Sequence, residues 1–311
     1  GIERLGRDGG NRGGVDDAAP AGFQACTRRS AHAHGAVQVD VHRLGKCLRV
    51  VFNVALDDAR TVDQHIEFAE AQRLGMGGLV NVGQGSEAKP RLIIVEYRPR
   101  KLARSCRNEH LVLVGKTLTY DTGGYSLKVN NGMVGMKYDM TGAATVYQAI
   151  LAIAALKLPV KVTSYLCLAE NMPSGSATRP NDVVTFRNGK SVEITNTDAE
   201  GRIVMADGLI LASELKPDLI VDVATLTGAA RVALGNRFTG LMGDDSSVET
   251  LKSAASTAGE LVWHMPLPEE LFELLQSDIA DMMNSRVGNP SGGMLVAGLF
   301  LREFVGTKSA K

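Results

Sequence analysis

Two carboxylates, a guanidinium and a glycine lie within seven consecutive residues, Asn-Thr-Asp-Ala-Glu-Gly-Arg at positions 196–202. A strand-like run at 191–195 precedes this segment, and an apolar, helix-like run at 203–215 follows it. If the segment is extended, Asp198 and Glu200 project to the same side, because strand side chains alternate. Two carboxylates held that close repel each other unless a cation lies between them. The segment is therefore a candidate metal site, and a helix N-terminus capped by Asp198 is the alternative.

A second group of polar residues follows the apolar run 110–114, which predicts a fully buried strand. Lys116 and Asp121 come just past this run, and open α/β sheets place their ligand sites beyond the carboxyl ends of the strands. The ordinary alternatives are a solvated lysine at a strand end and an aspartate that forms a turn before Gly123 and Gly124. Both residues are candidates for the same site.

Two further candidates, Lys128 and Asp139, complete a set of four carboxylates and three bases. Asp139 precedes the apolar run 143–158 and could simply cap that helix. Histidine and cysteine are nearly absent from the set, so a His-rich zinc site, a Cys-His pair and a Ser-His-Asp triad are poorly supported. Four carboxylates could instead hold two divalent ions bridged by one or two of them. The full set is Lys116, Asp121, Lys128, Asp139, Asp198, Glu200 and Arg202.

The elements that must position these residues predict an α/β fold, with a mostly parallel central sheet and helices on both faces. The helix expected at 143–158 stands between buried strands at 110–115 and 160–169, which is the order of a parallel strand-helix-strand unit. A third buried strand is expected at 219–226. The other expected elements are helices at 62–74, 203–215, 247–258 and 294–305, a strand at 91–97, a hairpin that turns at 188–189, and a helical piece at 269–283.

Composition excludes several classes of protein. Lys+Arg and Asp+Glu balance at 34 each, so no net field points to nucleic acid or to an anionic membrane. The longest nearly apolar run, 149–156, is far shorter than the roughly 20 residues that span a bilayer. The four cysteines are too far apart for a C-x-x-C knuckle, which favours reduced thiols in a cytoplasmic protein.

The three blocks of candidates together resemble one family. Residues 196–202 reproduce the signature of the leucine aminopeptidase family, the cytosolic M17-type metallopeptidases. Residues 114–128 look like the first metal-binding block of that family, and residues 136–142 look like the second. The resemblance covers about residues 74–305 with the motifs in order, and three agreeing blocks make it specific. Thr117 and Tyr120 depart from the glycine and phenylalanine that are usual at these positions.

The resemblance implies a site for two divalent ions, Mn²⁺ or Zn²⁺. Lys116, Asp121, Asp139 and Glu200 would bind the tighter ion. Asp121, Asp198 and Glu200 would bind the exchangeable ion, so that Asp121 and Glu200 bridge the two. Lys116 would then have to be a neutral amine, which burial and a nearby dication favour.

The same resemblance implies a metal-dependent aminopeptidase that releases N-terminal residues, preferentially leucine and other apolar ones, by attack of a metal-bridging hydroxide. Lys128 would stabilise the oxyanion, and Arg202 would hold a bicarbonate ion that acts as general base. Family members form hexamers, so peptide substrates and copies of the same chain are the expected partners. The expected substrate-binding residues are Met136, Asn196, Thr225, Leu226 and Gly228. Another dinuclear-metal hydrolase and a catalytically impaired oligomeric relative are the alternatives.

The two ends of the chain differ from the family pattern. Residues 1–60 show no sustained period of 2 or 3.6, include the Gly/Arg-rich run 9–14, and contain none of the 11 methionines. We expect residues 1–60 to be atypical, either disordered or misread, and residues 61–311 to form the catalytic domain. The last strands of the family sheet are not recognisable after 305, and we expect them to be missing.

Overall fold

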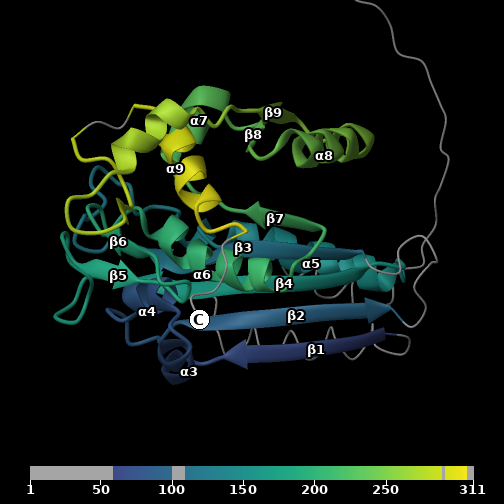
Figure 1. Ribbon diagram of the computed structural model, residues 1–311, viewed down its shortest axis with the longest axis horizontal. Helices are drawn as coiled ribbons and strands as arrows, with labels where there is room; N and C mark the ends of the chain where they lie inside the picture. Colours follow the sequence, from purple (N-terminus) through teal and green to yellow (C-terminus); the bar gives the residue numbers. More distant parts are fainter. Residues whose placement is uncertain (1–58, 100–108, 289–290, 307–311) are drawn as a thin grey trace, which may run out of the picture. The chain divides into compact units, whose positions relative to one another are not determined.

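The computed structural model describes residues 59–99, 109–288 and 291–306, which surround a five-stranded sheet in the order β1-β2-β4-β3-β7 (Figure 1). The strands are β1 (Ala59–Ile66), β2 (Arg91–Pro99), β3 (His110–Asp121), β4 (Lys161–Asn171) and β7 (Leu219–Val223). β4, β3 and β7 are parallel to one another, whereas β2 is antiparallel to both β1 and β4. Four strands therefore point the same way, which confirms a mostly parallel sheet. The prediction for residues 1–58 falls outside the described residues.

Helices α5 (Thr141–Ala155) and α6 (Glu200–Glu214) cover opposite faces of this sheet (Figure 1). A Cβ on Gly115 would lie 2.5 Å from the Cα of Ala143 in α5, so that helix packs directly on the β3 backbone. A Cβ on Gly208 in α6 would lie 2.7 Å from the Cys167 sulfur and 2.8 Å from Val114 Cγ1. Since neighbouring strand residues face opposite ways, Val114 faces α6 and Gly115 faces α5. Helices on both faces are thus confirmed, and the close approach requires glycine at both positions.

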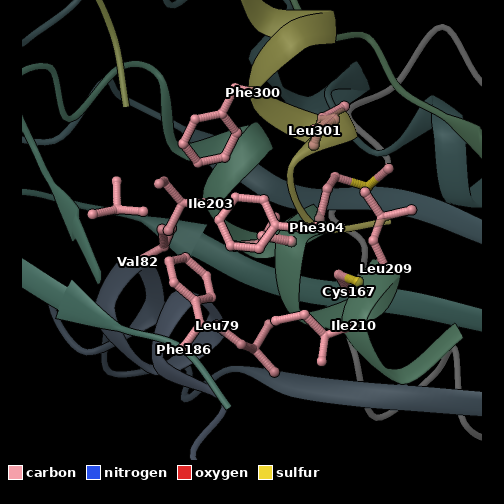
Figure 2. Close-up of a cluster of buried hydrophobic side chains, with 14 of the residues drawn as sticks. Leu79, Val82, Cys167, Phe186, Ile203, Leu209, Ile210, Phe300, Leu301 and Phe304 are labelled. Atoms are coloured by element: carbon pink, nitrogen blue, oxygen red, sulfur yellow. The ribbon is translucent and has the colours of Figure 1, made fainter. Parts of the chain in front are cut away.

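The main core surrounds α6, of which almost every residue is buried (Figure 2). Helix α4 (Gly77–Gly83) and helix α9 (Gly293–Arg302) pack against α6, and α4 also packs against β4. Phe304 joins these layers, because its ring centroid lies 4.8 Å from that of Phe186 and 5.1 Å from that of Phe300. The sheet, α4 and α9 together enclose α6 on almost every side. This burial fixes the position of its N-terminal residues, Glu200 and Arg202.

The other described elements form two small sheets and several short helices. One sheet has the order β10-β6-β5, and the other pairs β8 with β9. The strands of the first small sheet are β5 (Val183–Thr185), β6 (Ser191–Glu193) and β10 (Met282–Met283). Those of the second are β8 (Thr239–Leu241) and β9 (Val262–His264). The helices are α3 (Phe68–Arg73), α7 (Gly228–Leu234), α8 (Asp245–Ala258) and the 3-10 helices η2 (Met136–Tyr138) and η3 (Glu269–Leu275). β5 and β6 are antiparallel across the turn at 188–189, which confirms the predicted hairpin.

Two predicted elements are wrong. Residues 62–66 belong to β1, which pairs with β2 from Ala59 opposite Pro99 to Ile66 opposite Leu92, and only Phe68–Arg73 is helical. The ladder of a neighbouring strand overrides the weak helical spacing of this segment. The helical piece predicted at 269–283 stops at Leu275, because Met282 and Met283 pair in parallel with Val192 and Glu193.

A buried carboxylate in the middle of α6 supports α4. Asp207 Oδ2 accepts a hydrogen bond from the Leu79 backbone N at 2.7 Å, while Oδ1 meets no hydrogen-bond partner within the described part of the chain. Met76, the N-cap of α4, makes no side-chain cap there, so Asp207 satisfies one of the free N–H groups of the first turn. Burial raises the pKa of Asp207 to about 8, against the effect of the backbone N–H donors.

We expect Asp207→Asn to reduce the loss of stability at high pH. The folded-state pKa lies above the unfolded-state value, so the folded chain binds more protons and its stability falls as pH rises toward about 8. The carboxamide keeps an acceptor for Leu79 N without the charge. Thermal unfolding should be measured from pH 6 to 9. As pH rises, the melting temperature of the variant should increase relative to that of the wild type, by about 2–4 °C for each kcal/mol of unfolding free energy. A temperature difference that stays constant with pH would contradict this explanation.

Candidate metal centre

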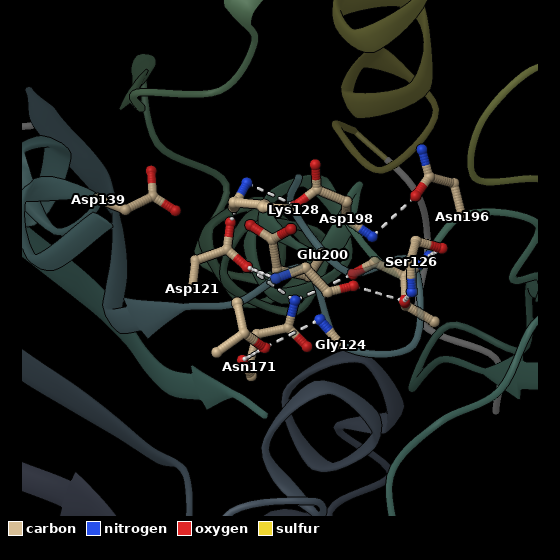
Figure 3. A network of polar contacts seen from close by, with 12 residues as sticks. Asp121, Gly124, Ser126, Lys128, Asp139, Asn171, Asn196, Asp198 and Glu200 are labelled. Carbon is tan, nitrogen blue, oxygen red and sulfur yellow. Dashed lines mark hydrogen bonds and ion pairs between the residues drawn. The ribbon is translucent and has the colours of Figure 1, made fainter. Parts of the chain in front are cut away.

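Six of the seven candidate residues form two neighbouring groups of ion pairs at the carboxyl end of β3, and the carboxylates of Asp121, Asp198 and Glu200 bring the two groups together (Figure 3). Lys116 Nζ lies 2.8 Å from Asp139 Oδ2 and 3.0 Å from Glu200 Oε1. Lys128 Nζ lies 2.9 Å from Asp121 Oδ2 and 2.5 Å from Asp198 Oδ1. The structure therefore places each lysine between two carboxylates.

Asp121 ends β3 and is held by two hydrogen bonds. Its Oδ1 accepts from Gly123 N at 2.9 Å and from Asn171 Nδ2 at 2.8 Å. Asn171 ends β4, which is parallel to β3, so the two residues meet at the same edge of the sheet. This is the edge where α/β sheets place ligands. The side chain of Asp121 is thereby fixed with its Oδ2 directed to Lys128.

Residues 195–199 form a turn and not an extended segment, so the premise of alternating side chains is wrong. Helix α6 begins at Glu200, and its N-cap is Ala199, which makes no side-chain cap bond. Asp198 is therefore not the cap, and its backbone N donates to Asn196 Oδ1 at 2.8 Å within the turn. The two carboxylates still converge because the turn brings Asp198 beside the first residue of the helix.

Asp139 does not cap α5 either. The N-cap of that helix is Met140, which makes no side-chain cap bond, and Asp139 Oδ1 instead accepts from Thr225 Oγ1 at 2.8 Å. Thr225 also offers its main-chain O to Lys116 Nζ at 3.2 Å. The loop after β7 thus supports the same side of the cluster as Lys116.

Burial sets the electrostatics of the cluster. Asp121, Glu200 and Lys116 are only 2–3% exposed. Burial raises the pKa of Glu200 to about 7, although Lys116 opposes the rise. Burial also raises the pKa values of Asp139 and Asp198. These carboxylates resist ionisation unless positive charge lies beside them.

The lysines supply part of that charge. Burial by itself lowers the pKa of Lys116, but the carboxylates of Glu200 and Asp139 outweigh it, and the net pKa is raised. Lys128 also has a raised pKa, because its hydrogen bonds to Asp198 and Asp121 outweigh burial. The protein alone keeps Lys116 protonated. A neutral Lys116 ligand would require the added charge of a dication.

The carboxylates fit a divalent cation. One ligand oxygen from each of Asp121, Asp198 and Glu200 lies within 4.8 Å of the others. Glu200 Oε2 is buried and has no hydrogen-bond partner among the described residues, so it is free to bind an ion. Oxygen ligands suit Mn²⁺, and Zn²⁺ also accepts them. Asp139 joins this set only through Lys116.

Arg202 lies apart from the ion pairs, in the first turn of α6. It is 6% exposed, and its Nη1 donates to the Asn284 main-chain O at 2.8 Å. Burial lowers the pKa of Arg202 to about 10, which leaves the guanidinium charged at neutral pH. Arg202 and Asn196 line a cavity of about 250 Å³ together with Arg286. The cavity therefore has a positive wall.

The expected substrate-binding residues divide into two groups. Thr225 contacts the cluster and Asn196 lines the cavity, as described above. Met136 begins η2, Leu226 packs against the core, and Gly228 begins α7. Substrate binding by all five stays a prediction.

Three buried polar residues support the cluster, although the sequence analysis assigned no role to them. Thr197 Oγ1 donates to Gly123 O at 2.6 Å and accepts from Ser126 N at 2.7 Å, which joins the turn to the loop that carries Lys128. Asn171 and Asn284 contact the same turn. The position of Asn171 at the end of a buried strand was a usable signal. We find no sequence signal for Asn284.

The fold and the acidic centre define an α/β domain with a candidate metal site at the carboxyl edge of its sheet. This chain belongs to the cytosol aminopeptidase family, because the model of that family's catalytic domain matches residues 52–310. It is 60% identical over 232 residues to the probable cytosol aminopeptidases of Clavibacter michiganensis and Leifsonia xyli. These alignments cover 75% of this chain but 45% and 46% of the relatives, so the chain spans about half their length.

Two solved structures have the same fold. A bottromycin maturation enzyme, BotP, in complex with Mn has a TM-score of 0.76 at 41% identity, covering 84% of this chain and 56% of that one. The cytosol aminopeptidase from Coxiella burnetii has a TM-score of 0.77 at 35% identity, covering 84% and 55%. Within the described ranges, no helix is both long and apolar enough to cross a bilayer.

We expect Glu200→Gln to lower the metal content of the purified chain. The amide keeps the shape of the side chain but removes a buried negative charge, which Lys116 and the two metal ions would share. After loading with MnCl₂ and desalting, elemental analysis should show fewer ions per chain than in the wild type. Glu214→Gln is a matched control at the other end of α6, where Glu214 pairs with Arg187 at 2.8 Å. Full metal occupancy in Glu200→Gln would refute a bridging role.

Proposed function

We propose that this chain carries the catalytic centre of a metal-dependent aminopeptidase, which releases N-terminal residues from peptides and prefers leucine and other apolar ones. The observation that carries the proposal is the largely buried group of four carboxylates and two lysines in a chain of the cytosol aminopeptidase family. Two ions, Mn²⁺ or Zn²⁺, would be held by Lys116, Asp121, Asp139, Asp198 and Glu200. When bound, they would supply a water that is acidic enough to attack a peptide carbonyl at neutral pH.

Lys128 has the charge and the access for an electrostatic role. Its side chain is 16% exposed, compared with 3% for Lys116, so a substrate could reach it. Its raised pKa keeps the ammonium charged at neutral pH. A positioned cation that donates a hydrogen bond to a developing oxyanion lowers the barrier of acyl transfer. We assign this role to Lys128.

Arg202 suits a small planar anion. Its guanidinium is buried and charged, and its Nε finds no hydrogen-bond partner in the described ranges. Guanidinium groups bind planar anions with paired hydrogen bonds. Bicarbonate bound to Arg202 would supply a general base. Resemblance to the family also supports a homohexamer in the cytoplasm.

A free amino terminus should be required for cleavage. The carboxylates around Lys128 favour a charged amine, whereas an acyl group removes the positive charge and leaves a single neutral amide N–H. We expect Mn²⁺-dependent release of p-nitroaniline from leucine p-nitroanilide and none from its N-acetyl derivative. Excess EDTA should stop the reaction. Equal turnover of the blocked substrate would indicate a different hydrolase.

Lys128→Ala should leave metal bound while it lowers kcat by about 100-fold or more, which is the loss typical of one oxyanion donor. Lys137→Ala is the control, because Lys137 lies on the nearby η2 and its Nζ stacks over Tyr138 at 5.1 Å from the ring centroid. Metal content and kcat should be measured on the same samples. A kcat within tenfold of the wild type would remove Lys128 from the mechanism.

A further inference from the structure

The turn that carries Asp198 is held by side chains from distant parts of the chain. Within residues 195–199, Ala199 N donates to Asn196 O at 3.2 Å and Asp198 N donates to Asn196 Oδ1 at 2.8 Å. The turn connects β6 to α6, and its residues belong to no strand of a sheet. Its position relative to Asp121 therefore depends on contacts that come from other elements.

Asn171 makes one of these contacts from the end of β4. It is 5% exposed, and its Nδ2 donates both to Asp121 Oδ1 at 2.8 Å and to Thr197 O at 3.0 Å (Figure 3). A single amide group therefore links the carboxylate of Asp121 to the backbone of Thr197, the residue before Asp198. It fixes the separation of Asp121 and Asp198.

Asn284 makes the other contact from the segment after β10, and it is completely buried. Its Oδ1 accepts from Thr195 N at 2.9 Å and from Asn196 N at 3.2 Å. Its Nδ2 donates to Asn196 O at 2.7 Å and to Ala199 O at 3.4 Å. Its main-chain O accepts from Arg202 Nη1. Asn284 thus joins both ends of the turn to the first turn of α6.

The chemistry of both positions requires a carboxamide. At 171 the group must donate twice, and at 284 it must donate and accept, which one neutral amide does and a carboxylate does not. A carboxylate at 171 would place negative charge against Asp121 Oδ1 and Thr197 O. A hydrocarbon side chain would leave buried carbonyl and N–H groups without partners.

We propose that Asn171 and Asn284 are positioning residues that clamp the turn 195–199 and thereby set the affinity of the carboxylate cluster for divalent metal. The inference rests on the metal-dependent function proposed above. Groups that orient metal ligands typically change metal affinity by about 10- to 100-fold when they are removed. A purely structural role would lower the stability of the chain without changing the affinity of the folded molecules.

The test measures Mn²⁺ affinity directly. Asn171→Leu and Asn284→Leu keep the approximate side-chain volume and remove the hydrogen bonds. The full chain is titrated with MnCl₂, free Mn²⁺ is followed by its electron paramagnetic resonance signal, and circular dichroism confirms that each variant is folded. We expect each variant to bind Mn²⁺ about 10- to 100-fold more weakly. The double variant should lose less than the product of the two single losses, because both residues hold one turn.

Thr163→Val is the matched control. Thr163 is also fully buried and lies on β4, where its Oγ1 is 2.9 Å from His110 Nε2, roughly 25 Å along the strand from Asn171. It should lower the melting temperature and leave Mn²⁺ affinity within twofold of the wild type. Asn171→Ala and Asn284→Ala decide the question if a leucine variant does not fold.

Two results would overturn the proposal, and they have different meanings. Folded Asn171 and Asn284 variants that bind Mn²⁺ as tightly as the wild type would reduce both residues to a structural role and leave the metallopeptidase function intact. A wild-type chain that binds no Mn²⁺ would overturn the proposed function and the clamp together.

Discussion

The burial of three carboxylates, with a fourth half-buried, beside two lysines is the constraint on which the site depends. Removing charges from water costs several kcal/mol for each ion unless opposite charges and hydrogen bonds replace the solvent. Lys116 and Lys128 each lie between two carboxylates at 2.5–3.0 Å, and even so burial keeps the pKa of Glu200 near 7. The protein's own cations therefore compensate the acidic group only in part. A centre of this kind has a strong physical reason to bind a metal.

The fold supplies the rigidity that such a centre needs. Helix α6 is buried by the sheet, α4 and α9, so its first residues cannot move without disturbing the core (Figure 2). The helix N-terminus also favours the negative charge of Glu200. A Cβ at Gly201 would lie 2.5 Å from Lys116 Cε, which means that Lys116 passes the helix backbone on its way to Glu200. Core packing and charge placement are thus determined by the same helix.

The neutral amides have a different function from the lysines. Lysines offset charge, whereas Asn171 and Asn284 orient the chain without adding any. This division is useful in an acidic site, because an additional ionised group would shift the pKa of every neighbour. Lys128 compensates the charge of Asp121 and Asp198, and its side chain is also partly exposed. In the proposed mechanism, the stability of the site and its chemistry are therefore coupled through Lys128.

The sequence by itself predicted which polar residues come together at one site and which strands are parallel. Lys116, Asp121, Lys128, Asp139, Asp198 and Glu200 all reach one cluster, and the order β3-α5-β4 matches the predicted strand-helix-strand unit. Both results follow from local patterns, because hydrophobic periodicity and short motifs depend on residues close together in the chain.

Only the tertiary structure decided how these residues are held. It paired residues 59–66 with β2, placed Asp198 in a turn, and brought Asn284 to Asn196, 88 positions away in the sequence. It also selected which lysine lies between which carboxylates. A hydrogen bond between distant residues leaves no periodic trace in either segment, so its partners become known only when the chain is folded.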